Sequence, residues 1–157
     1  MPDETTIRSH GEKEIGIFYN SWKSEFDYKK SVAELYRRAV WFKANPRSEA
    51  YMRALFSERS PDGTFLNAQS DPDWTSHLAS ADSILLLYPD SIGIGFAAIE
   101  SEVAAGKQTW ATVRVLNGRR RAFVFNGKVR RQLRLRRFIE QTMLGEALFT
   151  MGFLAVT

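Results

Sequence analysis

The segment Ser83–Tyr88, with the sequence SILLLY, constrains the fold more than any other stretch of the chain. Residues 84–87 are all apolar and do not alternate with polar residues, which is typical of a strand that is covered on both faces. Such strands lie in parallel sheets, and a parallel sheet needs crossover connections that are usually helices. Strand patterns and helix patterns do alternate along this chain. The sequence therefore predicts an α/β fold, a Rossmann-like three-layer sandwich whose sheet is mostly parallel.

The remaining elements follow from local periodicity and from turn residues. Strands are expected at 14–20, 64–67, 109–116 and 120–125. Helices are expected at 32–42, from Ser48, after Asp71-Pro72-Asp73, at 95–106 and from Lys128 toward the end. Asn117-Gly118 is typical of a two-residue hairpin turn in which both positions need positive φ, so the last strand should form an antiparallel edge. We expect a flexible tail at 1–12, the Rossmann-like domain at 13–127 and a basic, then apolar, C-terminal helix at 128–157.

The chain contains no cysteine and only two histidines. The absence of cysteine excludes a disulfide framework, a thiolate nucleophile and a cysteine-ligated zinc site. His10 and His77 lie far apart in the sequence, so a histidine-rich metal site is not expected. The first residues, MPDETTIRSH, are polar and lack the apolar core of a secretory signal, so a cytoplasmic protein is expected.

A glycine-containing segment, Gly93-Ile94-Gly95-Phe96-Ala97-Ala98, follows the strand at 83–88 and formally satisfies G-x-G-x-x-A. In a dinucleotide site the glycines follow the strand directly, and an acidic residue comes about 20 positions later. Here residues 89–92 intervene, and residues 115–117 contain no acid. The chain also lacks a G-x-x-x-x-G-K-[ST] motif. We therefore expect neither a dinucleotide cofactor nor a Walker-type nucleotide site, and no other cofactor is indicated.

The loops after the strands at 14–20 and 83–88 form the expected ligand site, because open α/β sheets bind ligands outside the carboxyl ends of their strands. The candidate ligand-binding residues are Tyr19, Asn20, Ser21, Tyr88, Ser91, Gly93 and Gly95. Glycines permit a close approach of the backbone, and the start of the next helix offers free N–H groups to an anion. The alternative is that Asp90 and Ser91 only cap the following helix and that the two glycines make a tight turn.

Asp90 and Glu100 are the candidate catalytic residues at this edge. Glu100 and Glu102 are two positions apart and cannot share a helix face. Ile99 and Val103 indicate the buried side, so Glu102 should face solvent, whereas Glu100 could reach back to the loop. A partly buried carboxylate at that place could act as a nucleophile or a general base. The alternative is a surface glutamate without a catalytic role.

A pattern over residues 81–107 combines Ala81-Asp82 before an apolar strand, Asp90, a glycine turn, a Glu-bearing helix and Ala105-Gly106-Lys107. This pattern resembles the nucleoside 2-deoxyribosyltransferase-like group of Rossmann-type proteins, and an aromatic residue such as Tyr19 after the first strand fits it too. The resemblance implies a nucleotide, nucleoside or nucleotide-sugar ligand and glycosyl or ribosyl transfer or hydrolysis. Glu100 would then be the nucleophile at the anomeric carbon, and Asp90 would orient the sugar. The spacing from Glu100 to Gly106-Lys107 is short for the family, and the hairpin and the C-terminal helix do not belong to its pattern.

Positive charge is concentrated in the last third of the chain. Residues 107–157 hold 11 of the 22 lysines and arginines but only 2 of the 18 acidic residues. The first half of the expected C-terminal helix carries a cluster of candidate anion-binding residues: Arg130, Arg131, Arg134, Arg136 and Arg137. The second half is apolar on nearly every side.

Three interpretations of this C-terminal helix stay open. In the first, the helix packs on the sheet and its arginines are solvated. In the second, a basic collar precedes an apolar segment that associates with an anionic membrane surface. In the third, the arginines bind nucleic acid phosphates. This interpretation is less favoured, because aromatic residues are sparse around the arginines. The last two make the chain a non-enzymatic module for a membrane, a partner protein or a nucleic acid. The apolar helix also favours self-association, so a homo-oligomer is expected.

Overall fold

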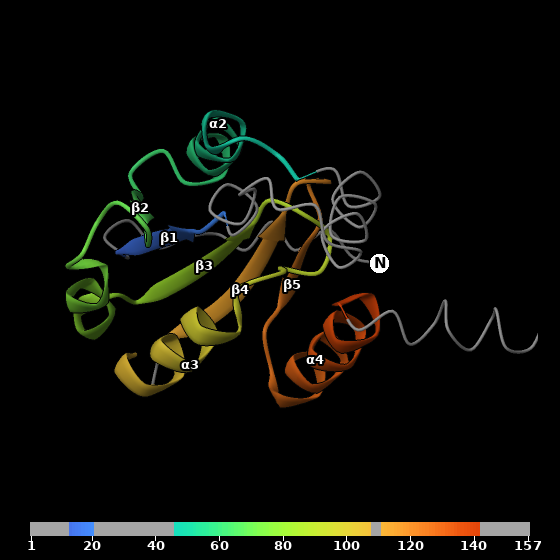
Figure 1. The fold of residues 1–157 in the computed structure, drawn as a ribbon. Helices are drawn as coiled ribbons and strands as arrows, with labels where there is room; N and C mark the ends of the chain where they lie inside the picture. Colours follow the sequence, from blue (N-terminus) through green and yellow to red (C-terminus); the bar gives the residue numbers. More distant parts are fainter. Residues whose placement is uncertain (1–12, 21–45, 108–110, 142–157) are drawn as a thin grey trace, which may run out of the picture.

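A five-stranded sheet organises the protein in the computed structural model, which describes residues 13–20, 46–107 and 111–141 (Figure 1). The strand order is β2-β1-β3-β4-β5. The strands are β1 (Glu14–Phe18), β2 (Thr64–Asn67), β3 (Ser83–Tyr88), β4 (Thr112–Asn117) and β5 (Ala122–Val124). The strands β1 to β4 are mutually parallel, and β5 pairs antiparallel with β4. The predicted mostly parallel α/β sheet with an antiparallel edge is thus confirmed.

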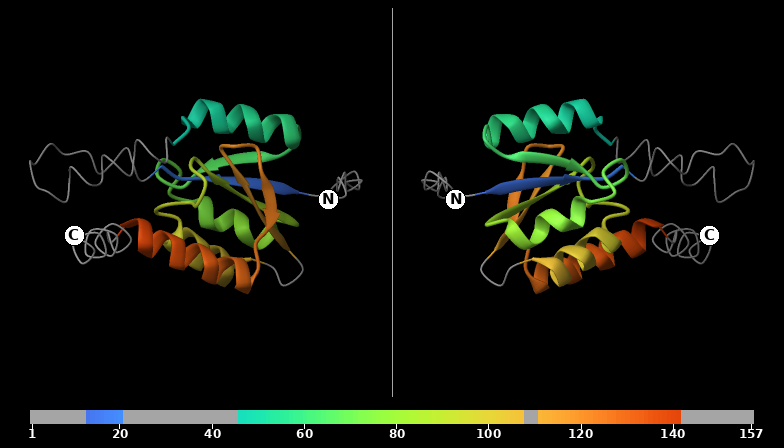
Figure 2. Two further views of the ribbon diagram at one scale, coloured as in Figure 1. Left: turned by 90° about the vertical axis from the view of Figure 1, so that its right-hand side faces the viewer. Right: turned by 90° about the vertical axis from the view of Figure 1, so that its left-hand side faces the viewer.

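Helices cover both faces of this sheet (Figure 2). Helix α2 (Glu49–Arg59) lies on one face, and η2 (Trp74–Ser80, a 3₁₀-helix), α3 (Ala97–Gly106) and α4 (Gly127–Gln141) lie on the other. Each face has its own apolar core, one with Met52 and Phe56 of α2 and the other with Val103 of α3 and Leu133 of α4. The three layers agree with the Rossmann-like sandwich predicted from the sequence.

The central strand β3 shows why its sequence has no polar alternation. Leu85 and Leu87 pack in the core under α2, whereas Ile84, Leu86 and Tyr88 pack in the core under α3 and α4. All five side chains are fully buried. Each buried leucine or isoleucine contributes about 1.5–3 kcal/mol, so this strand is the strongest apolar contribution to the sheet.

Strands β1 and β3 are neighbours, but the chain continues from β1 to β2 on one side and from β3 to β4 on the other. This reversal of direction is the topological switch point of the sheet. The register pairs Phe18 with Leu87, so the two strands end side by side. The loops that follow them therefore meet at one edge of the sheet.

The turn between β4 and β5 differs from the predicted two-residue hairpin. The N–H of Arg120 donates to the carbonyl of Asn117, and the N–H of Asn117 donates to Arg121, so residues 118–120 form a three-residue loop. The positive φ (63°) falls on Arg120 and not on Asn117 or Gly118. A three-residue loop with one left-handed residue is the next most common hairpin connection. Gly118 is needed for another reason, since a Cβ there would lie 2.7 Å from the carbonyl oxygen of Pro89.

Several expected elements lie outside the described residues. They are the tail at 1–12, the helix at 32–42, the first residues of the strand at 109–116 and the apolar part of the C-terminal helix at 142–157. Within the described ranges, no helix is long and apolar enough to cross a membrane.

Candidate functional site

The loop after β1 lies against the loop after β3. The Tyr19 ring meets the edge of Phe96 with 6.1 Å between ring centroids, and Phe96 in turn lies 4.6 Å from the ring of Tyr88. Asn20 exchanges hydrogen bonds with the side chain of Gln69, which donates to its carbonyl at 3.1 Å. Tyr19 and Asn20 are half-buried. The fold thus brings Tyr19 together with residues 88–96 and Asn20 together with Gln69 after β2, whereas Ser21 lies outside the described residues.

Asp90 organises the loop after β3. Its carboxylate is 2% exposed and accepts hydrogen bonds from the backbone N–H groups of Ile92 (2.8 Å), Gly93 and Ile94 (3.1 Å). The helix α3 begins after Phe96 without a side-chain cap, so Asp90 caps the turn and not the helix. A carboxylate that accepts several backbone N–H groups holds a loop in one shape, because each of these bonds is charge-assisted.

Gly93 and Gly95 give this turn its backbone shape. Their φ angles are 66° and 84°, which is the left-handed region that side chains disfavour. A Cβ on Gly93 would also lie 2.5 Å from the ring of Tyr88. The amide of Gly93 already donates to Asp90, whereas Ser91 and Gly95 are only half-buried. Ser91 and Gly95 are therefore the parts of the loop that a ligand can reach.

Glu100 lies in a buried cluster with Tyr88 and Arg137. The guanidinium of Arg137 donates to both carboxylate oxygens, with 3.0 Å between Nη1 and Oε2, and the Tyr88 hydroxyl donates to Oε1. Glu100 is 1% exposed and Arg137 is 5% exposed. Arg137 also donates from Nε to the carbonyl of Ile92 at 2.8 Å, which anchors the glycine loop to α4. Both oxygens of Glu100 are thus engaged by protein donors.

The cluster changes the acidity of its members. Burial raises the pKa of Tyr88 far above its ordinary range, and the neighbouring charge of Glu100 raises it further. For Arg137, burial lowers the pKa, but the hydrogen bond to Glu100 and the electrostatic interactions with Tyr88 and Glu100 outweigh it and raise the pKa overall. Tyr88 therefore stays neutral and Arg137 stays charged around neutral pH, which suits a structural ion pair.

The five arginines expected to form an anion-binding surface divide into two groups. Arg131, Arg134 and Arg136 are exposed and Arg130 is half-buried, with its guanidinium 3.1 Å from the hydroxyl of Ser101. Arg137 differs from the expected surface position, because it is buried where Glu100 neutralises its charge and the Tyr88 hydroxyl accepts a hydrogen bond from it. The spacing Val129, Leu133, Arg137 places it on the buried side of α4, and this spacing is the signal in the sequence that indicates its burial.

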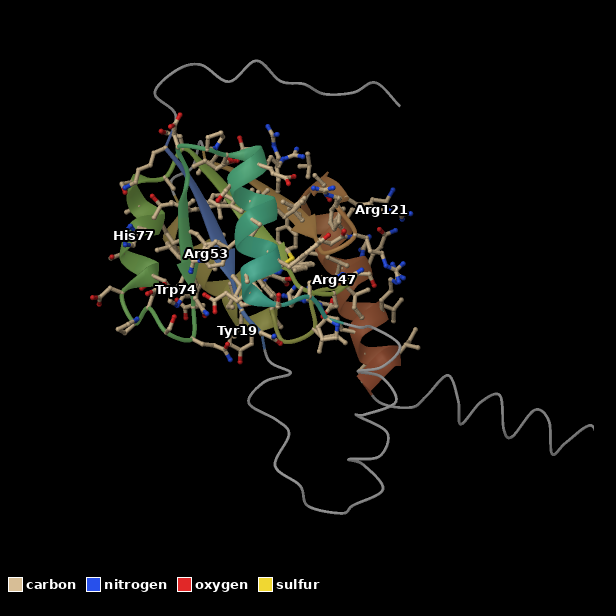
Figure 3. The ribbon with its side chains drawn as sticks, turned by 90° about the horizontal axis from the view of Figure 1, so that it is seen from above. Tyr19, Arg47, Arg53, Trp74, His77 and Arg121 are labelled. Atoms are coloured by element: carbon tan, nitrogen blue, oxygen red, sulfur yellow. The ribbon has the colours of Figure 1, made fainter. Side chains whose placement is uncertain are left out.

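Arg47 is a residue of this edge that the sequence did not indicate. Its N–H donates to the carbonyl of Pro89 at 2.8 Å, so it lies directly beside the end of β3. Its side chain is exposed, and its guanidinium lies 5.5 Å from the centroid of the Tyr51 ring. Figure 3 shows Arg47 and Tyr19 toward the edge where β1 ends. The helix α2 begins one residue after Ser48, whose hydroxyl caps it by accepting from the N–H of Tyr51, so its positive end faces this edge.

In the part of the chain that the structure describes, no three histidine, aspartate or glutamate side chains gather in a way that could hold a metal ion. The fold and the site define a doubly wound, Rossmann-like α/β sandwich with strand order 2-1-3-4-5. No protein-family model, no curated protein and no solved structure matches the chain.

Proposed function

We propose that this protein binds a nucleotide, nucleoside or nucleotide sugar at the carboxyl ends of β1 and β3. The observation that carries the proposal is the topological switch point between these strands, where open α/β sheets bind their ligands. The residues proposed to meet the ligand are Tyr19, Asn20, Arg47, Ser91 and Gly95.

The chemistry of these residues suits such a ligand. Tyr19 offers an aromatic ring, and aromatic rings stack on nucleobases. Arg47 offers an exposed guanidinium, which pairs with phosphate oxygens in a bidentate way. The start of α2 adds a positive helix end at the same edge. Because Arg137 neutralises Glu100 in the first turn of α3, this carboxylate does not repel an anion at the edge.

The proposal covers binding and not the transfer chemistry that the family resemblance implies. A nucleophile has to reach the anomeric carbon of a sugar. Glu100 could do so only after leaving Arg137 and Tyr88, which would uncover a buried charge. Asp90 likewise holds three backbone N–H groups of its own loop. We therefore assign both carboxylates to the support of the site.

Thermal unfolding in the presence of nucleotides, nucleosides and nucleotide sugars tests the proposal. A ligand at 100 times its dissociation constant should stabilise the fold by about 2.7 kcal/mol, which is visible as a rise in Tm. A panel without any shift would contradict it.

Two arginine substitutions test whether the ligand binds beside Arg47. Arg47→Gln should reduce the shift caused by a nucleotide much more than that caused by the matching nucleoside, because only the nucleotide has a phosphate. Arg59→Gln, at the opposite end of α2, is the matched control and should change neither shift. Equal effects of the two substitutions would remove Arg47 from the site.

A further inference from the structure

Helix α4 exposes large apolar side chains on the side turned away from the sheet. Leu135 is 60% exposed, Phe138 55% and Ile139 40%, whereas Leu133 and Arg137 are buried on the opposite side. With 3.6 residues per turn, positions 135, 138 and 139 share one face. Among the described residues, the exposed large apolar side chains outside this helix are scattered singly at Tyr51 and Val124. The outer face of α4, defined here as residues 128, 131, 134, 135, 138 and 139, is therefore an unusual surface.

The same face carries positive charge. Lys128, Arg131 and Arg134 are exposed, and residues 127–139 contain no acidic residue. Arg131 precedes Leu135 by one turn, and Arg134 precedes Phe138 by one turn, so cations and apolar groups are interleaved and not segregated. Exposed apolar side chains that cluster on one face, and are not scattered singly, indicate an interaction surface.

We propose that the outer face of α4 binds the surface of an anionic lipid bilayer. Leu135 and Ile139 enter the boundary between headgroups and acyl chains, and Arg131, Arg134 and Lys128 pair with the headgroup phosphates and carboxylates. Binding to a membrane surface strengthens with the apolar area that enters it and with the attraction of lysine and arginine to anionic lipids, and this face offers both. Each basic residue near an anionic surface strengthens binding by roughly fivefold, which corresponds to about 1 kcal/mol.

Two other occupants fit this face less well. A second copy bound across a twofold axis would bring two such basic faces together, with no acid at 127–139 to pair with Arg131 and Arg134. A nucleic acid would satisfy the arginines but leave Leu135 and Ile139 without apolar partners. The chain that follows α4 also favours a lipid surface, because residues 142–157 contain Glu146 as their only charged residue.

Co-sedimentation of the full chain with lipid vesicles tests the proposal. The protein should bind vesicles of phosphatidylcholine mixed with phosphatidylserine, bind phosphatidylcholine alone at least about tenfold more weakly, and lose affinity as salt is added. The double substitution Arg131→Glu and Arg134→Glu should weaken binding at least about tenfold. The charge-matched control is Arg59→Glu with Arg121→Glu, which changes the net charge equally but away from α4, and it should retain most of the affinity.

The apolar part of the face has its own matched pair of variants. Leu135→Ser should weaken vesicle binding severalfold, whereas Val124→Ser, at a similarly exposed position on β5, should not. All four variants should unfold within a few degrees of the unchanged protein, because each substituted side chain is exposed.

Four results would overturn the proposal. They are equal binding to both kinds of vesicle, an equal loss for the two charge-reversed pairs, binding to oligonucleotides without binding to vesicles, and a dimer in solution that Leu135→Ser dissociates while vesicles do not bind. None of these outcomes depends on ligand binding at the carboxyl ends of β1 and β3.

Discussion

Arg137 of α4 and Glu100 of α3 form a buried ion pair in which one guanidinium meets both carboxylate oxygens. The same guanidinium donates to the carbonyl of Ile92, so a single side chain joins two helices and the loop after β3. This planar, bidentate geometry is available to arginine and not to lysine. The shape of the candidate site therefore depends on a residue 42 to 47 positions further along the chain than the loop residues 90–95 that form it.

Removing the arginine should be costly. We expect Arg137→Met to lower the free energy of unfolding by about 3–5 kcal/mol, because it leaves the carboxylate of Glu100 buried without a charged partner. Arg136→Met, the exposed neighbour, should change it by less than about 0.5 kcal/mol. Urea denaturation of the two variants makes the comparison, and similar values for both would contradict the buried pair.

The second carboxylate gives an independent prediction. Asp90→Ala should lower the free energy of unfolding by about 3 kcal/mol or more, since three buried N–H groups lose their acceptor and each unmade bond costs about 1–3 kcal/mol. Asp73→Ala is the matched control, because this exposed aspartate precedes η2 without a side-chain cap bond. If Asp90 only oriented a sugar, both variants would be equally stable in urea without ligand.

Much of the fold was predictable because it is determined by local patterns. The apolar run of β3 indicated burial on both faces, and Ser48 marked the start of α2, where its hydroxyl does cap the helix. The edge of the sheet where Tyr19, Asn20 and the glycine loop meet followed from the general rule for parallel strands. These inferences need only periodicity, capping and the direction of the strands.

The remaining features depend on contacts between distant segments. The hairpin at Asn117-Gly118 has three loop residues, and Gly118 is held by β3, since its N–H donates to Tyr88 and a Cβ on it would meet the carbonyl oxygen of Pro89. A cluster of arginines looks like a surface, and although the spacing Val129, Leu133, Arg137 indicates which arginine is buried, the sequence does not indicate that Glu100 is its partner. Arg47 lies at the site through one backbone bond to Pro89, for which the sequence has no pattern.

The glycines of the loop should differ in their tolerance of a methyl group. Gly93→Ala should cost more than about 2 kcal/mol, because the left-handed backbone disfavours alanine by roughly 1–2 kcal/mol and the Cβ would also strike the ring of Tyr88. Gly95→Ala also has a left-handed backbone, so we expect a loss of at least about 1–2 kcal/mol. Gly127→Ala, with nothing within 4 Å of the added Cβ, should be neutral or slightly stabilising. Thermal melts compare the three variants, and a Gly93→Ala or Gly95→Ala protein as stable as Gly127→Ala would contradict the loop geometry.

The raised pKa of Tyr88 predicts how stability changes at high pH. Burial, reinforced by the charge of Glu100, holds this pKa well above the ordinary value of 10.0, so between pH 10 and the folded-state pKa the unfolded chain loses a proton that the folded protein keeps. The contribution of Tyr88 to stability is therefore complete below pH 10 and is lost progressively above it, by about 1.4 kcal/mol per pH unit.

The variant Tyr88→Phe isolates this effect because it has no hydroxyl proton to lose. When its free energy of unfolding is subtracted from that of the unchanged protein at each pH, the titration of all other groups cancels. This difference, measured by urea denaturation from pH 8 to pH 11.5, should be constant up to about pH 9.5 and then fall with that slope. Parallel profiles over the whole range would mean that the Tyr88 hydroxyl ionises equally well in the folded protein, which its burial against Glu100 does not allow.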